Sequence, residues 1–458
     1  MEDGRVAVDG RRSKRLEGRP IRPLVVLSLV TLVDQIDTSI LRGVLPLIED
    51  DFDLADWQLG SLGFAFVFVN ALTAIPAGWI ADRVRRTRLI GFTLLSWSAL
   101  SLLSALARNF PQLFLARASL GFGQAIDDPA STSLLADTYP ASTRGKVFSV
   151  QQVSLFVGGG LGIGLGGLVG DTYGWQWAFA IVGMPGSLVG LLAFRLREPK
   201  RGEADGIDLP EPERLPIREL AKGAAGSLVS DLRMIFAIRT MRYVLVGFSV
   251  MLFSIAGISY WLAVYHERYS GFTEKEAAGV AAALLTVGGL IGTFAGGAIA
   301  DRLYGVSPAA RVTHVSNAIL GCLVFFTASL AMPIVPVRLL LQFVAILSAA
   351  TALPGLRASL MDVTPVQARG MTTSAFALTS TVLGTASAPI VVGGLSDLTG
   401  SLVTAYLIVT PPTIVGAIIL RRARHTIVED AAAIFQGLAE RAESRPDGEP
   451  GDAPEITL

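Results

Sequence analysis

The amino-acid sequence predicts an all-α membrane protein whose twelve transmembrane helices form two six-helix bundles. Of the 458 residues, 51% are hydrophobic and 17% are charged, and the mean hydropathy of +0.54 is too high for an ordinary soluble protein. Twelve helices of about 20 residues would occupy roughly 240 positions, about half of the chain. Apolar stretches of this length occur in two sets of six, and motifs of the first set recur in the second.

The first set of apolar stretches follows a polar, basic N-terminal segment, residues 1–22, and is expected to form the N-terminal bundle, residues 23–194. The first stretch has about 25 residues, which is longer than the core of a cleavable signal peptide, so we expect it to be retained as a span. The six expected spans are residues 23–47, 58–81, 88–107, 112–136, 147–169 and 175–194.

A polar stretch, residues 195–241, separates the two sets and is expected to be a cytoplasmic linker. Within it, apolar residues from Ile217 to Phe236 recur at helical spacing, which predicts an amphipathic helix on the membrane surface or, alternatively, a solvated linker helix. The second bundle is expected over residues 242–420, and a polar tail, residues 421–458, is expected to be disordered. Its six spans are residues 242–264, 278–300, 312–332, 336–360, 371–395 and 402–420.

The distribution of basic residues predicts the orientation of the chain. Lysine and arginine near span ends stay on the cytoplasmic side, and they are abundant before span 1, between spans 2 and 3 and after span 12. The loop after span 1 instead contains Glu49, Asp50, Asp51, Asp53 and Asp56 and no basic residue. Both termini are therefore expected in the cytoplasm, and the protein in the plasma or inner membrane of the cell.

Several classes of function find no support in the sequence. Cys322 is the single cysteine and there are three histidines, so we expect no intrachain disulfide, metal site or cofactor. The sequence shows no nucleophile paired with a base, so we do not expect an enzyme. It also lacks the Gly-x4-Gly-Lys-Ser/Thr pattern of a phosphate-binding loop, which argues against a nucleotide-driven pump. We expect a monomer in contact with membrane lipids and a small-molecule substrate, without a nucleic-acid partner.

An internal duplication indicates a carrier. Pro129, Asp137, Pro140, Arg144 and Gly145 recur at one constant spacing as Pro354, Asp362, Pro365, Arg369 and Gly370. Gly78, Ala81, Asp82 and Arg83, at the end of span 2, likewise recur as Gly297, Ala300, Asp301 and Arg302. Two parallel repeats are the organisation of alternating-access carriers.

Ionisable residues within the spans are the candidate site. Span 1 contains Asp34, Asp37 and Arg42, and the two acids are about 60° apart on a helix, so they can share one side. Because a charge at bilayer depth costs at least about 2.5 kcal/mol, such residues are functional candidates by default. The candidates in span 4 are Arg117, Gln124, Asp127 and Asp128, of which Asp127 points away from the line formed by the other three.

We expect these groups to line a central cavity in which one acid binds a proton and Arg117 stabilises its charged form, so that a proton gradient drives transport. The alternative is a set of static ion pairs, such as Arg42 with the acidic first loop or Asp127 with a loop arginine. The second half offers few such groups, so the other cavity wall is expected to be apolar; its polar side chains are chiefly Ser254, Ser259, Tyr260, Gln342, Thr379 and Ser380. Such a cavity suits an amphipathic or cationic organic molecule better than a sugar.

Span 5 is rich in glycine from Gly158 to Gly170. Small residues allow helix backbones to approach closely, and we expect close packing here. A bending, pathway-sealing role of the kind found in antiporters is the alternative.

The stretch from Gly78 to Arg88 (Gly-Trp-Ile-Ala-Asp-Arg-Val-Arg-Arg-Thr-Arg) resembles the loop 2-3 signature of the major facilitator superfamily, except that Arg85 replaces a glycine. The stretch from Arg117 to Ala125 is similar to the span 4 signature of the same family. This resemblance implies a latch between the halves on the cytoplasmic side, whose residues are Asp82, Arg83, Arg86 and Arg144 and, in the second half, Asp301, Arg302 and Arg369.

Within that superfamily, the chain looks most like the spinster-like branch, which includes exporters of lysolipids and sphingoid lipids. The residues that carry this resemblance include Asp37 followed by Gly43-Val-Leu-Pro46, and Trp261 in span 7. The branch usually has an arginine directly after the span 1 acid and a glutamate in span 4, where this chain has Thr38 and Gln124. The resemblance implies a proton-coupled transporter of lipid-like molecules, with a transporter of organic cations or anions from another branch as the alternative and a lipid enzyme or passive channel as more distant ones.

Overall fold

The computed structural model describes residues 20–200, 203–205, 236–364 and 369–433. The chain is helical throughout this part, and no strand occurs in it. The expected amphipathic linker helix, from Ile217 to Phe236, lies outside the described residues except for Phe236 itself.

The first half of the chain forms six long helices in the order that the apolar stretches predicted. They are α1 (Arg22–Phe52), α2 (Asp56–Arg83), α3 (Arg86–Ala105), α4 (Phe110–Thr138), α5 (Ala141–Tyr173) and α6 (Trp175–Ala193). Asn109 caps α4 by accepting a hydrogen bond from the backbone N–H of Gln112. The Tyr139 hydroxyl, directly after α4, donates to the carbonyl of Pro20 (2.7 Å) and so ties the start of α1 to the end of α4.

The second half begins with four continuous helices and ends with two interrupted ones. The continuous helices are α8 (Arg239–Ser270), α9 (Glu274–Tyr304), α10 (Pro308–Leu330) and α11 (Val335–Asp362). The interrupted ones are α12 (Arg369–Ser380), η3 (Thr381–Thr385) and α13 (Ala388–Thr399), followed by α14 (Leu402–Val409) and α15 (Pro411–Arg422).

These interruptions differ from the uninterrupted spans expected over residues 371–395 and 402–420. η3 is a π-helical turn in which the backbone N–H of Ala386 donates to the carbonyl of Thr381 (2.9 Å), just before Pro389. The second break lies at Pro411 and Pro412, which have no backbone N–H to donate. Proline therefore accounts for both breaks.

The chain also stays ordered past the expected start of the tail. A short helix, η4 (Ala423–His425), follows α15, and residues 427–433 are helical as well. Ile427 and Ala431 are buried against the core of the second half, which explains why this stretch is not the disordered segment that its composition suggested.

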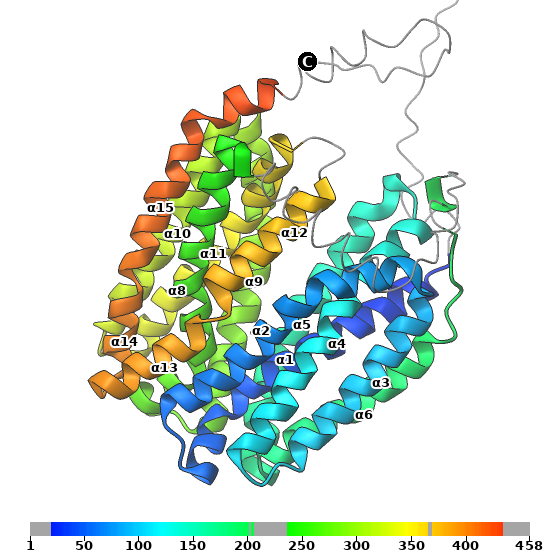
Figure 1. Cartoon of the computed structure of the whole chain (residues 1–458). Helices are drawn as coiled ribbons and strands as arrows, with labels where there is room; N and C mark the ends of the chain where they lie inside the picture. Colours follow the sequence, from blue (N-terminus) through cyan, green and yellow to red (C-terminus); the bar gives the residue numbers. More distant parts are fainter. Residues whose placement is uncertain (1–19, 201–202, 206–235, 365–368, 434–458) are drawn as a thin grey trace, which may run out of the picture.

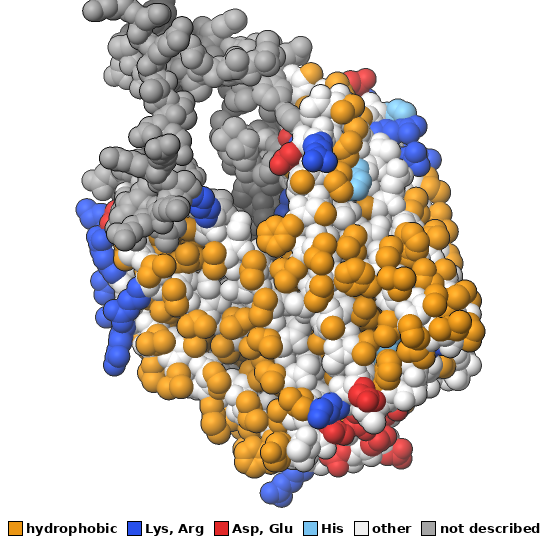
Figure 2. Space-filling view, turned by 180° about the vertical axis from the view of Figure 1, so that it is seen from behind, with side chains coloured by type: hydrophobic (Ala, Val, Ile, Leu, Met, Phe, Trp, Pro, Cys, Tyr) orange, Lys and Arg blue, Asp and Glu red, His pale blue; other side chains and the backbone are white. Residues whose placement is uncertain are grey.

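The described chain has the features of a multi-pass membrane protein. Ten of its helical stretches are long and apolar enough to cross a bilayer. α2 and α4 are not among these ten; α4 contains Arg117, Asp127 and Asp128, and the side chains of residues 74–83 in α2 are not described. Figure 2 shows a broad belt of hydrophobic side chains between the two ends of the molecule, with acidic side chains gathered at the lower end.

The two halves lie side by side (Figure 1). We call the end where α1 passes into α2 the loop-1 end, and the end where residues 201–235 connect the halves the linker end. α5 packs against α9, and α2 packs against α13. At the loop-1 end the contact is so close that a Cβ atom added to Gly393 of α13 would lie 2.4 Å from the carbonyl oxygen of Asp56.

The glycine run of α5 serves close packing, as the sequence predicted. A Cβ at Gly162 would lie 2.4 Å from the carbonyl oxygen of Ile36 in α1, and one at Gly160 would lie 1.8 Å from the Thr286 hydroxyl in α9. α5 therefore fits tightly between α1 of its own half and α9 of the other half.

Candidate functional site

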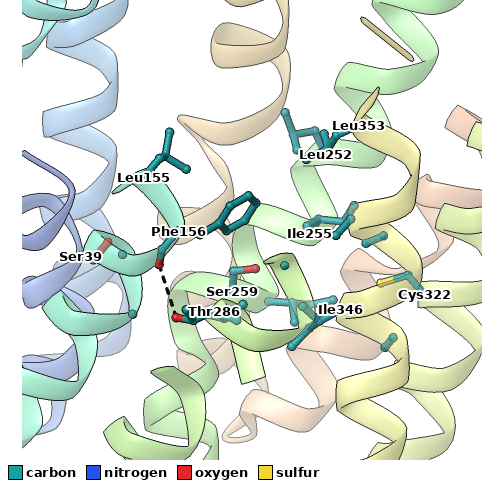
Figure 3. A pocket seen from close by; sticks show the side chains of 18 of the residues that line it. Ser39, Leu155, Phe156, Leu252, Ile255, Ser259, Thr286, Cys322, Ile346 and Leu353 are labelled. Atoms are coloured by element: carbon teal, nitrogen blue, oxygen red, sulfur yellow. Dashed lines mark hydrogen bonds between the residues drawn. The ribbon is translucent and has the colours of Figure 1, made fainter. Parts of the chain in front are cut away.

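A cavity of about 290 Å³ lies between the two halves. α1 and α5 form one wall, and α8, α9, α10 and α11 form the other. Figure 3 shows the ring of Phe156 extending from α5 toward Ile255 and Ser259 of the second half. The Thr286 hydroxyl donates to the carbonyl of Phe156 at 3.5 Å, which links α9 to α5 at the cavity wall (Figure 3).

The charge in this cavity is on the N-terminal wall. Among the described residues that line it, Arg42 is the only charged one, and Gln35 and Ser39 lie on the same helix. The wall from the second half is mainly apolar, as the sequence predicted; its residues include Phe248, Leu252, Ile255, Ile258, Ile319, Phe326, Ile346 and Leu353. Such a cavity can bind a molecule that combines an anionic group with an apolar part.

Arg42 was expected to be one of several charged groups in a shared cavity, or else to pair with the acidic first loop. It lines the cavity, and the described residues contain no ion pair between it and that loop. Two acids of that loop, Glu49 and Asp56, bind Arg268 of α8 instead. Arg42 lies one helical turn after Thr38 on α1.

Asp37 and Arg117 do not line the central cavity, so this part of the sequence prediction is wrong. Asp37 is 2% exposed and accepts hydrogen bonds from the Trp97 indole (2.8 Å) and the Ser101 hydroxyl (2.5 Å), both on α3. Arg117 approaches Asp37 at 3.6 Å and lies 3.9 Å from the centre of the Phe179 ring in α6. The pair is thus enclosed within the N-terminal half.

The reason is geometric. Helical spacing gives the angle between two side chains on one helix, but it does not give the direction of either relative to neighbouring helices. Asp37 faces α3 and α6, whereas Arg42 faces α8 across the cavity.

Asp34 lies beside the cavity wall, in a network of amides. It is 7% exposed, and its Oδ2 atom accepts from Gln124 of α4 (2.6 Å) and from Gln35 (2.9 Å). Gln124 also donates to the Thr38 hydroxyl (2.9 Å), so the two positions that depart from the spinster-like pattern contact each other. The other carboxylate oxygen, Oδ1, has no hydrogen-bond partner in the described structure.

The remaining acids of span 4 take different positions. Asp127 is 6% exposed and accepts a hydrogen bond from Ser131, and it interacts electrostatically with Asp34. The side chain of Asp128 lies outside the described residues.

Of the residues expected to form a latch between the halves, Arg86 binds partners within the N-terminal half. Its guanidinium is 2% exposed and binds Asp137 of α4 and Glu198 (2.8 Å), all within the N-terminal half. In the observed conformation Arg86 therefore binds partners of its own half, and its expected role in the latch stays a prediction. The side chains of Asp82, Arg83, Arg144 and Arg369 lie outside the described residues, while Asp301 and Arg302 are exposed at the end of α9.

The second half repeats this buried pair. Arg311 of α10 binds Asp362 of α11 at 2.8 Å. Asp362 is the repeat counterpart of Asp137, which binds Arg86 in the first half. Sequence reasoning recorded the repeated aspartates but missed their arginines, although Arg86 and Arg311 recur at that same spacing. The duplication therefore preserves a contact as well as a motif.

Glu198, directly after α6, is held in its charged form by the Arg86 cluster. Burial opposes its charge, but hydrogen bonds from the Thr87 backbone (2.9 Å) and from Arg86 outweigh the burial and hold the pKa of Glu198 below its ordinary value.

Polar contacts that no sequence pattern predicted join the halves at the loop-1 end. Arg268 of α8 binds Glu49 of α1 at 2.6 Å and Asp56 of α2 at 2.7 Å. Asp397 of α13 accepts from the backbone N–H groups of Asp56 (3.0 Å) and Trp57 (2.8 Å), which start α2. These contacts close this end in the observed conformation.

No group of three histidine, cysteine or acidic side chains that could hold a metal ion occurs among the described residues.

Comparison with known proteins places this arrangement in a family. The family model of the Major Facilitator Superfamily matches residues 27–338 of this chain. Protein spinster homolog 1 of Homo sapiens is 32% identical over 198 residues, which are 42% of this chain and 38% of that protein. The sphingosine-1-phosphate transporter SPNS2 of Danio rerio is 30% identical over 190 residues, which are 40% of this chain and 38% of that protein. The matched part thus spans about two fifths of the length of these relatives.

Solved structures extend the likeness to nearly the whole chain. A bacterial homolog of the human lysosomal transporter Spinster, in an inward-facing and unoccupied conformation, has a TM-score of 0.70 and 21% identity. That comparison covers 94% of this chain and 99% of the other. The human organic anion transporter MFSD10 has a TM-score of 0.60 at 19% identity and covers 87% of this chain. The chain belongs to the major facilitator superfamily, with spinster proteins among its similar relatives.

Proposed function

We propose that this protein is a secondary active transporter that moves a lipid-like anion across a membrane by alternating access. The observation that carries the proposal is the cavity between the halves, in which Arg42 is the only charged lining residue that the structure describes and faces a mainly apolar wall. An anionic headgroup at Arg42 and a hydrocarbon chain along α8, α10 and α11 would satisfy both walls at once.

Single-chain phosphates, such as lysophospholipids or phosphorylated sphingoid bases, have this chemistry. The printed name of the Danio rerio relative, a sphingosine-1-phosphate transporter, supports the same class. A cavity of about 290 Å³ is at the lower end of ordinary ligand pockets and suits a headgroup with part of its chain. A cationic substrate is disfavoured because it would meet the uncompensated charge of Arg42.

The topology that fits this function has twelve spans in two bundles, residues 23–194 and 242–420, with the N-terminal segment 1–22, the linker 195–241 and the tail 421–458 in the cytoplasm of a cell. α2 and α4 have 28 and 29 residues, which is long enough to cross a bilayer beside the ten apolar stretches. Exposed arginines at the linker end, such as Arg85, Arg88 and Arg421, support the orientation.

With that orientation, the conformation is inward-facing. The contacts of Arg268 and Asp397 close the loop-1 end, which would be the outer side. Outward opening must break these contacts, and binding energy or a proton gradient is the proposed source of the required free energy. One chain supplies both cavity walls, so we take a monomer as the transport unit.

A substrate panel tests the proposal. Purified protein in phosphatidylcholine vesicles would be assayed with single-chain amphiphiles of equal tail length whose headgroup is a phosphate, a neutral glycerol or an amine. Each compound would be measured with and without an imposed pH gradient. We expect the phosphate to be transported at least tenfold faster than the other two. Equal rates for all three, or a preference for a hexose, would overturn it.

A further inference from the structure

Asp34 is the least satisfied acid in the described part of the membrane-spanning region. Its side chain is more than nine-tenths buried, Oδ2 receives two amide hydrogen bonds, and Oδ1 receives none. An ionised carboxylate offers about four acceptor sites and strongly disfavours burial with a bare oxygen. A neutral carboxylic acid in the same place leaves much less charge unsolvated.

The charged groups around Asp34 do not neutralise it. On α1, Asp37 is already paired with Arg117 of α4, and Arg42 lies two turns away, about 12 Å along the helix. On α4, Asp127 adds a second negative charge beside Asp34. α5 approaches α1 through glycines, which bring no charge to Asp34. α6 contains no ionisable residue within Trp175–Ala193. The described charges of α2 and α9 are at the ends of these helices. On α8, Tyr260 is neutral as a phenol and its hydroxyl donates to the carbonyl of Leu59.

The site is connected to the cavity by a single side chain. Gln35 lines the cavity and donates to Asp34 through the same amide. If Asp34 loses or gains a proton, the orientation preferred by this amide changes, and the polar lining of the cavity changes with it. Gln124 anchors the opposite side of the carboxyl group by bridging Asp34 and Thr38.

From this geometry we propose that Asp34 is the residue that takes up and releases the coupling proton, and that it is protonated in the observed conformation. The proposal rests on the proposed transport function. It gives Asp37 a static role, because Asp37 has two hydrogen-bond donors and a cation in a closed environment. It also explains how the chain could couple without the span 4 glutamate, since the carboxyl group that Gln124 contacts comes from α1 instead.

The first test separates coupling from transport. Asp34→Asn keeps the shape of the protonated acid, so we expect it to exchange a single-chain phosphate amphiphile at equal pH within about threefold of the wild-type rate. Accumulation driven by a pH gradient should fall at least tenfold. Full gradient-driven accumulation by Asp34→Asn would overturn the proposal.

Two controls keep the outcomes distinct. If the wild-type protein exchanges no amphiphile, the proposed function fails; if it exchanges amphiphile but never responds to a pH gradient, only the assignment of Asp34 fails. Should Asp34→Asn not yield monodisperse protein, Gln124→Leu removes one donor from Asp34 without touching a cavity-lining residue. It should move the pH midpoint of gradient-driven transport to a higher pH, and an unchanged midpoint would refute the assignment.

Discussion

Arg268 and Asp56 form a bidentate ion pair between the two halves, with nitrogen–oxygen distances of 2.7 and 2.9 Å. The same guanidinium also binds Glu49, so one side chain of α8 joins α1 and α2 of the other half. Together with the Asp397 cap of α2, this pair closes the loop-1 end. A transporter that alternates must break it in every cycle.

Arg268→Gln is therefore expected to favour opening of the loop-1 end. Charge-assisted hydrogen bonds contribute about 1.5–3 kcal/mol each, so losing them should raise the population of the open form at least tenfold. Distances between spin labels at the loop-1 ends of α2 and α13 would report this change. Lys275→Gln, an exposed cation at the same end, is the control, and identical distance distributions for both variants would rule out the gate.

The buried pairs Arg86–Asp137 and Arg311–Asp362 are expected to stabilise their own halves. Removing one partner of a fully buried pair costs about 3–5 kcal/mol, and we expect a smaller cost here because the Asp137 and Asp362 side chains are 16% and 21% exposed. Arg86→Gln and Arg311→Gln should each lower the unfolding temperature in detergent by several degrees, whereas Arg88→Gln, which changes an exposed arginine, should not. Normal thermal stability of both buried variants would contradict this role.

Glu198 gives the Arg86 cluster a pH dependence. Since the pKa of Glu198 in the folded protein lies below the ordinary value of 4.5, its contribution to stability is complete above pH 4.5 and is lost as the pH falls through the folded value. The wild-type protein should lose more thermal stability than Glu198→Gln as the pH is lowered from 5.5 to about 3.5. Parallel losses in the two proteins would show that Glu198 does not carry the effect.

The length and order of the helices could be predicted from the sequence, because apolar stretches of span length have few alternatives in a bilayer. The stretch expected at residues 175–194 is α6, Trp175–Ala193, and that at 88–107 is α3, Arg86–Ala105. The glycines of α5 also predicted its packing correctly, because residues without a side chain allow helix backbones to approach closely.

The neighbours of each polar side chain could not be predicted in the same way. Asp37 and Arg42 are five residues apart on α1, yet one is enclosed by α3 and α6 and the other faces the second half. The contact of Arg268 with Asp56 joins positions far apart in the sequence, and such a pair depends on how the two halves dock. The internal duplication was the one sequence pattern that related distant positions. It relates Arg86 to Arg311 but does not show which residues they bind.

The packing of α5 provides a further test. Gly162→Ala would place a methyl group 2.4 Å from the carbonyl oxygen of Ile36, so α1 and α5 would have to separate. We expect a lower unfolding temperature and reduced transport. Gly279→Ala is the matched control in α9, where an added Cβ meets nothing within 4 Å, and equal effects of the two changes would refute the tight α1–α5 contact.

The role of Arg42 is tested most directly by uptake of a radiolabelled single-chain phosphate amphiphile into phosphatidylcholine vesicles that contain the purified protein. Arg42→Gln should reduce the initial rate at least tenfold through a higher KM, because a charge-assisted contact with the headgroup is worth about 1.5–3 kcal/mol. Arg108→Gln, which changes an exposed arginine before α4, should transport at the wild-type rate. Wild-type uptake by Arg42→Gln would contradict the anionic headgroup site.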